Sequence, residues 1–302
     1  MSSQVAVIGA AGVDTNIYLP GRDIDFSVES NFTENIDYVG QAGGYVARGY
    51  AQLGYATTYI GYLGEDFSGG MVRAAFQADG IDALYFADPA GTKRSVNFMY
   101  RDGRRKNFYD AKSSMTVAPD LTMCRGKLAG VRLCHFSIVN WARQLLPLAA
   151  EAGCLIATDL QDVADPEDAY RRDFVEHSDV LFFSAANHAD PEPLMRRFMA
   201  FAGKERLVVC GMGRHGCALG HEGRIRRFAA VDTGGAIIDT NGAGDSLAVG
   251  FLSSFFLDGY TIEDAILRGQ IAARHCCTIK ASSATLIRRS QLDTTFQGLR
   301  QG

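Results

Sequence analysis

The sequence has little of what marks fibrous, secreted or membrane proteins. Its 302 residues include only 7 Pro and 1 Trp, while hydrophobic residues make up 47% of the chain. This composition excludes long disorder, collagen-like repeats and a disulfide scaffold. No stretch of about 18 uncharged apolar residues occurs, so no transmembrane helix is expected. There is no basic excess either, because the net charge is -4. A broad basic face for nucleic acid or for an anionic membrane is therefore not expected.

The seven cysteines show no repeated Cys-x-x-Cys spacing, so a zinc site is not expected. The first residues lack the charged region and the apolar run of a signal peptide. An odd number of cysteines without a secretion signal is typical of reduced thiols, and we expect a cytoplasmic location.

Short apolar runs alternate with helical patterns along most of the chain. Strands are expected at 5–8, 57–60, 131–136, 155–159, 180–183 and 207–210, and helices at 44–53, 71–79, 142–152, 168–177 and 193–201. The polar tail, 286–302, is expected to end in a short helix. This alternation predicts an α/β fold with a mostly parallel sheet. Ligands of such sheets bind at the carboxyl ends of the strands.

Two segments interrupt this pattern. Hydrophobic and polar residues alternate from 96 to 101, and Asp102-Gly103 follows, which predicts a β-hairpin over 96–110. The segment 14–39 also looks extended and polar. We interpret both as a small β-layer inserted into the α/β body and able to act as a lid. A surface hairpin without a role is the alternative.

Basic residues crowd this hairpin, namely Arg101, Arg104, Arg105 and Lys106. Charged side chains protect the edge strand of a sheet against pairing with other chains. A solvated, charge-protected edge strand is therefore the favoured interpretation.

The clearest chemical signal lies at 237–252. Asn241-Gly-Ala-Gly-Asp245 follows a strand end and precedes an apolar helix expected from Ser246 to about Leu257. Small residues let backbone N–H groups converge on an anion at the helix N-terminus. A carboxylate there repels phosphate, but it can accept the proton of a hydroxyl that attacks phosphate. The alternative is an acidic helix cap after a glycine turn.

Asp239-Thr-Asn-Gly-Ala-Gly-Asp245 resembles the C-terminal signature of the ribokinase/PfkB carbohydrate kinase family, Asp-Thr-x-Gly-Ala-Gly-Asp. The stretch from Gly43-Gly44 to Gly54 resembles the N-terminal signature of that family. Similar segments follow in the family's order at 61–69, 80–82, 211–216 and 265–280. The resemblance implies one ribokinase-like domain over 1–302, a three-layer sandwich with a mostly parallel central sheet. It also implies a small β-sheet lid at roughly 14–42 and 91–112.

The resemblance implies an ATP-dependent kinase that phosphorylates a hydroxyl of a sugar or sugar derivative, with Mg²⁺ as a cofactor. Asp245 would be the general base, and the anion hole would consist of Gly242, Ala243 and Gly244. Acceptor binding is expected from Gly12, Asp14, Gly43, Gly44 and Arg48. Nucleotide binding is expected from Ser184, Asn187, Gly211, Gly213, Gly216 and Gln270. Asp239, with the loop 276–285, would hold a monovalent cation such as K⁺. In relatives the lid often makes the contact of a homodimer.

The sequence departs from the family pattern at several of these positions. The family usually has Asn at positions 12 and 48, where Gly12 and Arg48 stand. Ser184-Ala-Ala-Asn187 replaces Asn-x-x-Glu, a motif tied to the phosphate–magnesium site. A Thr or Ser is common where Gly211 stands, and Gly is usual where Ala281 stands.

Arg48 is expected on the helix face toward the acceptor. There it would bind an anionic group of the acceptor, or pair with a lid carboxylate, Glu34 or Asp37.

Other functions remain open at this stage. A nucleoside kinase of the same fold is the main alternative, and a ligand-binding protein with little kinase activity is the second, suggested by Ser184 and Asn187. A dinucleotide-dependent dehydrogenase is disfavoured because the first glycines lack the Gly-x-Gly-x-x-Gly spacing. The expected partners are a small sugar-like molecule and ATP, with neither nucleic acid nor membrane.

Overall fold

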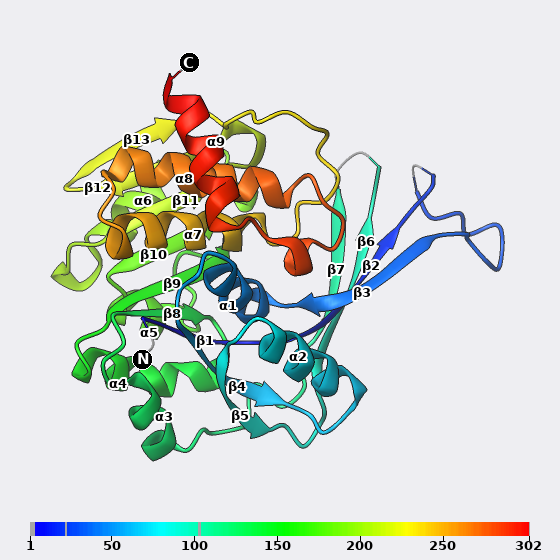
Figure 1. Cartoon of the computed structure of the whole chain (residues 1–302), viewed down its shortest axis with the longest axis horizontal. Helices are drawn as coiled ribbons and strands as arrows, with labels where there is room; N and C mark the ends of the chain where they lie inside the picture. Colours follow the sequence, from blue (N-terminus) through cyan, green and yellow to red (C-terminus); the bar gives the residue numbers. More distant parts are fainter. Residues whose placement is uncertain (1–3, 22, 102–103, 302) are drawn as a thin grey trace.

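The computed structural model describes residues 4–21, 23–101 and 104–301. Its centre is a nine-stranded sheet with the order β13-β12-β11-β10-β9-β8-β1-β4-β5 (Figure 1). Strands β5 to β11 of this order run parallel, and β12 and β13 are each antiparallel to their neighbours. The strands are β1 (Val5–Ile8), β4 (Thr57–Leu63), β5 (Asp82–Ala87), β8 (Leu133–Ser137), β9 (Leu155–Asp162), β10 (Val180–Ser184), β11 (Leu207–Gly211), β12 (Cys217–His221) and β13 (Arg224–Phe228). The expected α/β fold with a mostly parallel sheet is confirmed.

Helices cover both faces of this sheet and bury a separate hydrophobic core on each. On one face lie α1 (Ala42–Gln52), α2 (Phe67–Ala78), α7 (Ala243–Leu252), α8 (Ile262–Cys276) and α9 (Arg289–Gln301). On the other lie α3 (Leu121–Leu128), α4 (Leu146–Glu151), α5 (Arg172–His177) and α6 (Glu192–Met199). No helix in these described stretches is long and apolar enough to cross a membrane.

Several helices differ from the expected ranges. The expected helix 142–152 is divided into a 3₁₀ turn, Asn140–Leu145, and α4, with Pro147 in the first turn of α4. The expected apolar helix from Ser246 ends as α7 at Leu252 and continues as a π-helical turn, Ser253–Leu257. The tail forms a helix of 13 residues, because Leu292 and Phe296 give it a buried face.

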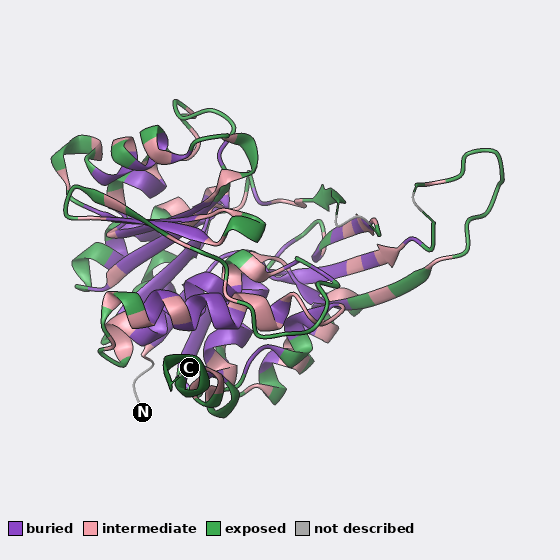
Figure 2. Cartoon of the chain, turned by 90° about the horizontal axis from the view of Figure 1, so that it is seen from above, coloured by how far each residue is buried: buried purple, intermediate pink, exposed green. Residues whose placement is uncertain are grey.

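A second, four-stranded sheet projects from the body, as Figures 1 and 2 show. Its order is β3-β2-β6-β7, and the strands are β2 (Gly12–Tyr18), β3 (Glu34–Gly40), β6 (Lys93–Met99) and β7 (Arg105–Asp110). We call it the small sheet. It confirms the expected β-layer, while the expected turn at Asp102-Gly103 lies outside the described residues.

Side chains alternate along strands, so each face of the small sheet has its own chemistry. Asp14, Asn16 and Tyr18 of β2 are in register with Ser95, Asn97 and Met99 of β6. Across this face Asn107 donates to Asn97 at 2.8 Å, and Asn97 donates to Asn16 at 2.9 Å. A line of asparagines therefore makes one face of the small sheet polar.

Candidate active site

A glycine turn begins α7 at the place where the sequence predicts an anion-binding element. Gly242 is the helix N-cap and has a left-handed φ of 75°. A Cβ atom on Gly242 would lie 2.2 Å from the ring of Tyr45. Only glycine both adopts a left-handed φ without strain and leaves room for the Tyr45 ring. The turn delivers the first N–H groups of α7, which lack partners within the helix, to the carboxyl edge of the large sheet.

Asp245 lies in the first turn of α7, as expected. Its pKa is raised well above the usual value, first by burial and then by the negative charge of Asp159. The nearby guanidinium of Arg105 acts in the opposite direction. Asp245 is partly exposed as a residue, but protein atoms surround most of its carboxylate. A carboxyl group with a raised pKa can exchange a proton more readily near neutral pH than an ordinary one.

Asp14 is the second expected carboxylate, and its position is fixed by α1. Gln41, the N-cap of α1, donates to Asp14 through its side chain at 2.5 Å and through its backbone at 3.4 Å. Burial raises the pKa of Asp14 to about 6 despite these bonds. The close contact between the Asp14 carboxyl group and the end of β3 requires glycine at position 40, where a Cβ would lie 2.3 Å from that carboxyl group.

The other expected acceptor-site glycines differ in their surroundings. A Cβ on Gly43 would lie 2.6 Å from the Ala10 carbonyl oxygen, so glycine lets α1 approach β1. A Cβ on Gly44 would have ordinary van der Waals space, with the nearest atom, from Val39, at 3.6 Å. Gly12 lies inside the small sheet, where a Cβ would meet the Lys93 carbonyl oxygen at 2.2 Å. Its glycine is thus required by the pairing of β2 with β6.

Two further residues of the site were missed from the sequence. Asp159, near the end of β9, influences the pKa of Asp245, and burial raises its own pKa to about 6. A carboxylate ending a buried strand was the signal that could have found it. The second is Arg105 of β7, whose guanidinium donates to Asn241 and lowers the pKa of both Asp14 and Asp245. The strand β7 is the exposed edge strand that the sequence predicted, and Arg105 also has this contact within the site.

Arg48 does not have the partners that the sequence suggested. Its Nε atom donates to Asp79, just after α2, at 2.6 Å, and its guanidinium also contacts Ser283 at 3.3 Å. Both side chains of the ion pair are about nine-tenths buried. The expected pairing with Glu34 or Asp37 is wrong, because Arg48 lies where α1 packs beside the end of α2. The guanidinium is bound in this internal ion pair, so it is not placed to bind an anionic group of the acceptor.

The expected nucleotide residues follow β10 and β11 at the same sheet edge. Ser184 ends β10 and its hydroxyl accepts from the backbone of Ala186 at 3.2 Å, while Asn187 is exposed. The loop 211–216 is tight, with positive φ at Gly213 and Gly216. Gln270 differs, since its buried side chain accepts from Val231 at 3.0 Å and donates to Cys217 at 3.2 Å. It holds α8 against β12 instead of facing open space.

Asp159 and Asp162 could hold a magnesium ion at this edge. They lie at an irregularity of β9, where Asp162 is in register with Ser184. Gln161 between them has a left-handed φ of 59°. One or two carboxylates plus substrate phosphates are the usual ligands of Mg²⁺. This pair fits such an ion near the place where the resemblance expects a glutamate.

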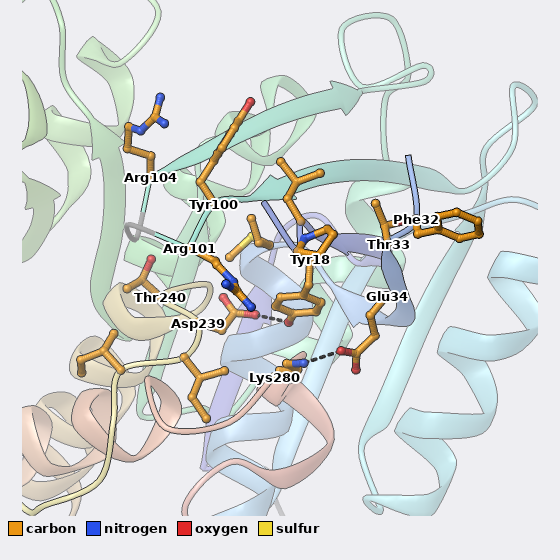
Figure 3. A pocket seen from close by; sticks show the side chains of 15 residues that line it. Tyr18, Phe32, Thr33, Glu34, Tyr100, Arg101, Arg104, Asp239, Thr240 and Lys280 are labelled. Carbon is orange, nitrogen blue, oxygen red and sulfur yellow. Dashed lines mark hydrogen bonds and ion pairs between the residues drawn. The ribbon is translucent and has the colours of Figure 1, made fainter. Parts of the chain in front are cut away.

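Asp239, by contrast, does not fit the expected cation site. Its buried carboxylate accepts hydrogen bonds from Asn16, Tyr18 and the backbone of Ala281. Figure 3 shows the bond from Tyr18 at the base of a groove of about 660 Å³ between the small sheet and the segment 237–240. The residues that line this groove include neither Asp14 nor Asp245. No group of three or more His, Cys, Asp or Glu side chains suited to a metal occurs in the described part of the chain.

A cradle of amide groups for phosphate beside carboxylates of raised pKa suits transfer of a phosphoryl group to a hydroxyl. This arrangement suits a phosphotransferase with an alcohol group as acceptor. Comparison with known proteins gives the family: residues 2–287 match the pfkB family of carbohydrate kinases. The chain belongs to this family, whose members use ATP.

The chain is similar to two proteins described by the same sugar derivative. It is 31% identical to the acarbose 7(IV)-phosphotransferase of Actinoplanes sp. strain SE50/110 over 293 residues, which are 96% of this chain and 97% of that protein. A microbiome-derived acarbose kinase has a TM-score of 0.90 and 28% identity, covering 98% of this chain and all of that one. The ribokinase of Arabidopsis thaliana, solved with ribose and ATP, shares the fold at a TM-score of 0.80 and 18% identity, covering 98% and 99% of the two chains.

Proposed function

We propose that this kinase transfers the γ-phosphoryl group of ATP to a hydroxyl of acarbose or a similar sugar derivative, with Asp245 as the general base. The observation that carries the proposal is the position of Asp245 in the first turn of α7, directly after the Gly242–Gly244 amides. Similarity over nearly the whole chain to two acarbose-phosphorylating proteins supports the acceptor.

Each group has a separate task in the proposed reaction. The first N–H groups of α7 stabilise negative charge on the transferred phosphoryl group. Asp14 accepts a hydrogen bond from the acceptor and orients it, and Asp245 takes the proton of the attacking hydroxyl. Mg²⁺ would neutralise charge on the ATP phosphates, held by Asp159 and Asp162. The small sheet covers the reacting atoms and limits the access of water.

The charge of the site favours a neutral or cationic acceptor over an anionic one. The negative charges of Asp159 and Asp14 both raise the pKa of Asp245, and the guanidinium of Arg105 lowers the pKa of Asp14 and of Asp245. The guanidinium of Arg48 is neutralised by its ion pair with Asp79. An acceptor with its own carboxylate or phosphate would meet net repulsion here.

ADP release with a panel of acceptors tests the proposal. The panel holds acarbose, neutral monosaccharides, amino sugars, sugar phosphates and nucleosides, and product mass identifies the phosphorylated compound. We expect acarbose or a related derivative to give the highest kcat/KM. A nucleoside or a sugar phosphate as the best acceptor would contradict the proposal.

Asp245→Asn is the matched variant for the catalytic base. The amide keeps the shape of the carboxylate but cannot accept the proton, so kcat is expected to fall by about 10²–10⁴. ATP affinity, measured by calorimetric titration, is expected to stay within about threefold, because the adenosine contacts lie elsewhere. A folded variant that keeps a third or more of the parent kcat would remove Asp245 from this role.

A further inference from the structure

Asp239 holds the turn that leads into the anion-binding residues. It is 2% exposed, and its Oδ1 atom accepts from the backbone N–H of Asn241 at 2.8 Å. Asn241 directly precedes Gly242, the N-cap of α7. The geometry of the amide cradle therefore depends on whatever fixes the Asp239 carboxylate.

Protein donors occupy the other oxygen of this carboxylate. Oδ2 accepts from Asn16 Nδ2 and from the Tyr18 hydroxyl, both at 2.7 Å, and from the Ala281 N–H at 3.3 Å. Ala281 has a left-handed φ of 48°. A cation at this place would meet the positive ends of N–H and O–H bonds instead of oxygen ligands.

The neighbouring carbonyl group is occupied as well. The thiol of Cys276 lies 3.0 Å from the carbonyl oxygen of Asn241, as a donor, and 3.0 Å from the Ser282 hydroxyl. Both of these oxygens, the carboxylate and the carbonyl, are natural ligands for a monovalent cation, and both have protein donors. The cation site implied by the family resemblance therefore does not fit these residues.

The side chain of Lys280 lies beside the same hydrogen-bond network. The ammonium of Lys280 is 4.7 Å from the centre of the Tyr18 ring and pairs with Glu34, as Figure 3 shows. Burial, together with the bond to Asp239, raises the pKa of Tyr18 above its usual value. The hydroxyl thus remains protonated and able to donate at neutral pH.

We propose that β2 of the small sheet does the work of the cation: Asn16 and Tyr18 fix Asp239 and thereby the amide cradle, and the kinase needs no monovalent cation. Asn16 is fully buried and its Oδ1 accepts from Asn97 at 2.9 Å and from Asn241 at 3.2 Å. It joins the small sheet to the turn directly. Asn16 and Tyr18 are positioning residues, because they act through Asp239. The inference rests on the proposed function only in using this turn as the anion hole.

Cation exchange tests the first half of this inference with a measurement of stability beside the measurement of activity. The thermal midpoint of the full chain is measured in potassium chloride and in tetramethylammonium chloride at equal ionic strength, and kcat is measured in both salts. We expect midpoints within about 1 °C and rates within about twofold, since binding only to the folded state would raise the midpoint. A saturable rise of either quantity beyond these limits, specific to potassium, would overturn the inference.

Tyr18→Phe tests the second half, with Tyr100→Phe as the control. Both substitutions delete one phenol oxygen near the end of a small-sheet strand, but the structure places only Tyr18 against Asp239. Loss of a bond to a buried carboxylate predicts a fall of about 3–6 °C in midpoint for Tyr18→Phe. It also predicts a fall in kcat of about tenfold or more, with the KM for ATP within about twofold. Equal effects of the two variants would refute the positioning role, even if the acceptor were not the proposed one.

Discussion

At the scale of single residues, the site contains three buried carboxyl groups, although burial of their charges costs folding free energy. Asp14, Asp159 and Asp245 all have raised pKa values, with burial the first cause in each case. Groups that destabilise the empty protein are typical of sites that bind and react. Substitution of such a group should therefore change activity and stability in opposite directions.

Asp14→Asn is expected to inactivate the kinase and to stabilise the empty protein at neutral pH. Folding raises the pKa of Asp14 from 3.8 to about 6, so the folded chain holds the proton more tightly than the unfolded chain. The contribution of Asp14 to stability is full below about pH 4 and is lost as the pH rises through 6. The Asn variant avoids that loss, so we expect its unfolding free energy at pH 7.5 to exceed the parent value by up to about 3 kcal/mol.

Urea unfolding of both proteins at pH 4.5 and at pH 7.5 measures this difference. The gain should shrink strongly at the lower pH, where Asp14 of the parent is mostly protonated. A gain of the same size at both pH values would mean that charge burial is not the cause.

Arg105→Met is expected to lower kcat and to move the acid limb of the pH profile to higher pH. The guanidinium lowers the pKa of Asp245 and of Asp14. Its removal raises both pKa values, so more alkaline solution is needed to ionise the base. Lys106→Met is the control, because residue 106 is the next in β7 and points to the opposite face. Profiles of kcat/KM against pH that coincide for both variants and the parent would exclude Arg105 from the site.

The sequence located the parts of the site that a continuous motif carries, and missed those that packing brings together. Asp245 and its glycines stand in one turn, and Asp14 follows the first strand, so their places were predictable. Asp159 and Arg105 reach the site from β9 and from the small sheet, and only the packed fold shows that they meet. The expected partner of Arg48 was wrong for the same reason, because its actual partner Asp79 is 31 positions away on a neighbouring element.

At the scale of elements, the expected strands of the large sheet were found within a few residues, because buried apolar runs specify them directly. Helix limits were less accurate. The π-helical turn that continues α7 is closed by a backbone bond from the Asp258 N–H to the Ser253 carbonyl oxygen at 3.0 Å. Hydrophobic periodicity does not encode such a change. The tail helix is longer than expected. Its buried face is narrow and most of its residues are polar, so the hydrophobic pattern indicates little of its length.

Close packing of α7 on α8 fixes the helix that carries Asp245. A Cβ on Gly269 of α8 would lie 2.7 Å from the Leu247 carbonyl oxygen of α7. Gly269→Ala should therefore push the helices apart and destabilise the protein by about 1–3 kcal/mol. The shift of α7 should also lower kcat, which thermal unfolding and steady-state kinetics together can measure.

Gly298→Ala is the control for this substitution. Gly298 lies in α9 with open space at its Cβ position, so alanine there should stabilise the chain by up to about 1 kcal/mol and leave kcat unchanged. A Gly269→Ala protein as stable and as active as the control would show that the helices tolerate separation.

At the scale of the whole molecule, the small sheet has a polar face toward the site, while its outer face combines aromatic side chains with charged ones such as Arg94 and Lys106. On the outer face Phe98 and Phe108 pack edge to face, with ring centres 5.7 Å apart, and Phe108 is 55% exposed. The strand β7 also forms an edge of this sheet. An exposed aromatic pair on a sheet with an open edge favours contact with another chain.

We predict that two copies of the chain associate through this outer face. Phe108→Ser should then convert a dimer into a monomer in light scattering coupled to gel filtration, because the serine removes most of the aromatic area that the contact would bury. Phe67→Ser is the matched control, since Phe67 is 89% exposed at the start of α2, outside the small sheet. The parent and the control should have the same mass, twice that of Phe108→Ser. A parent chain that is monomeric at micromolar concentration would refute the dimer.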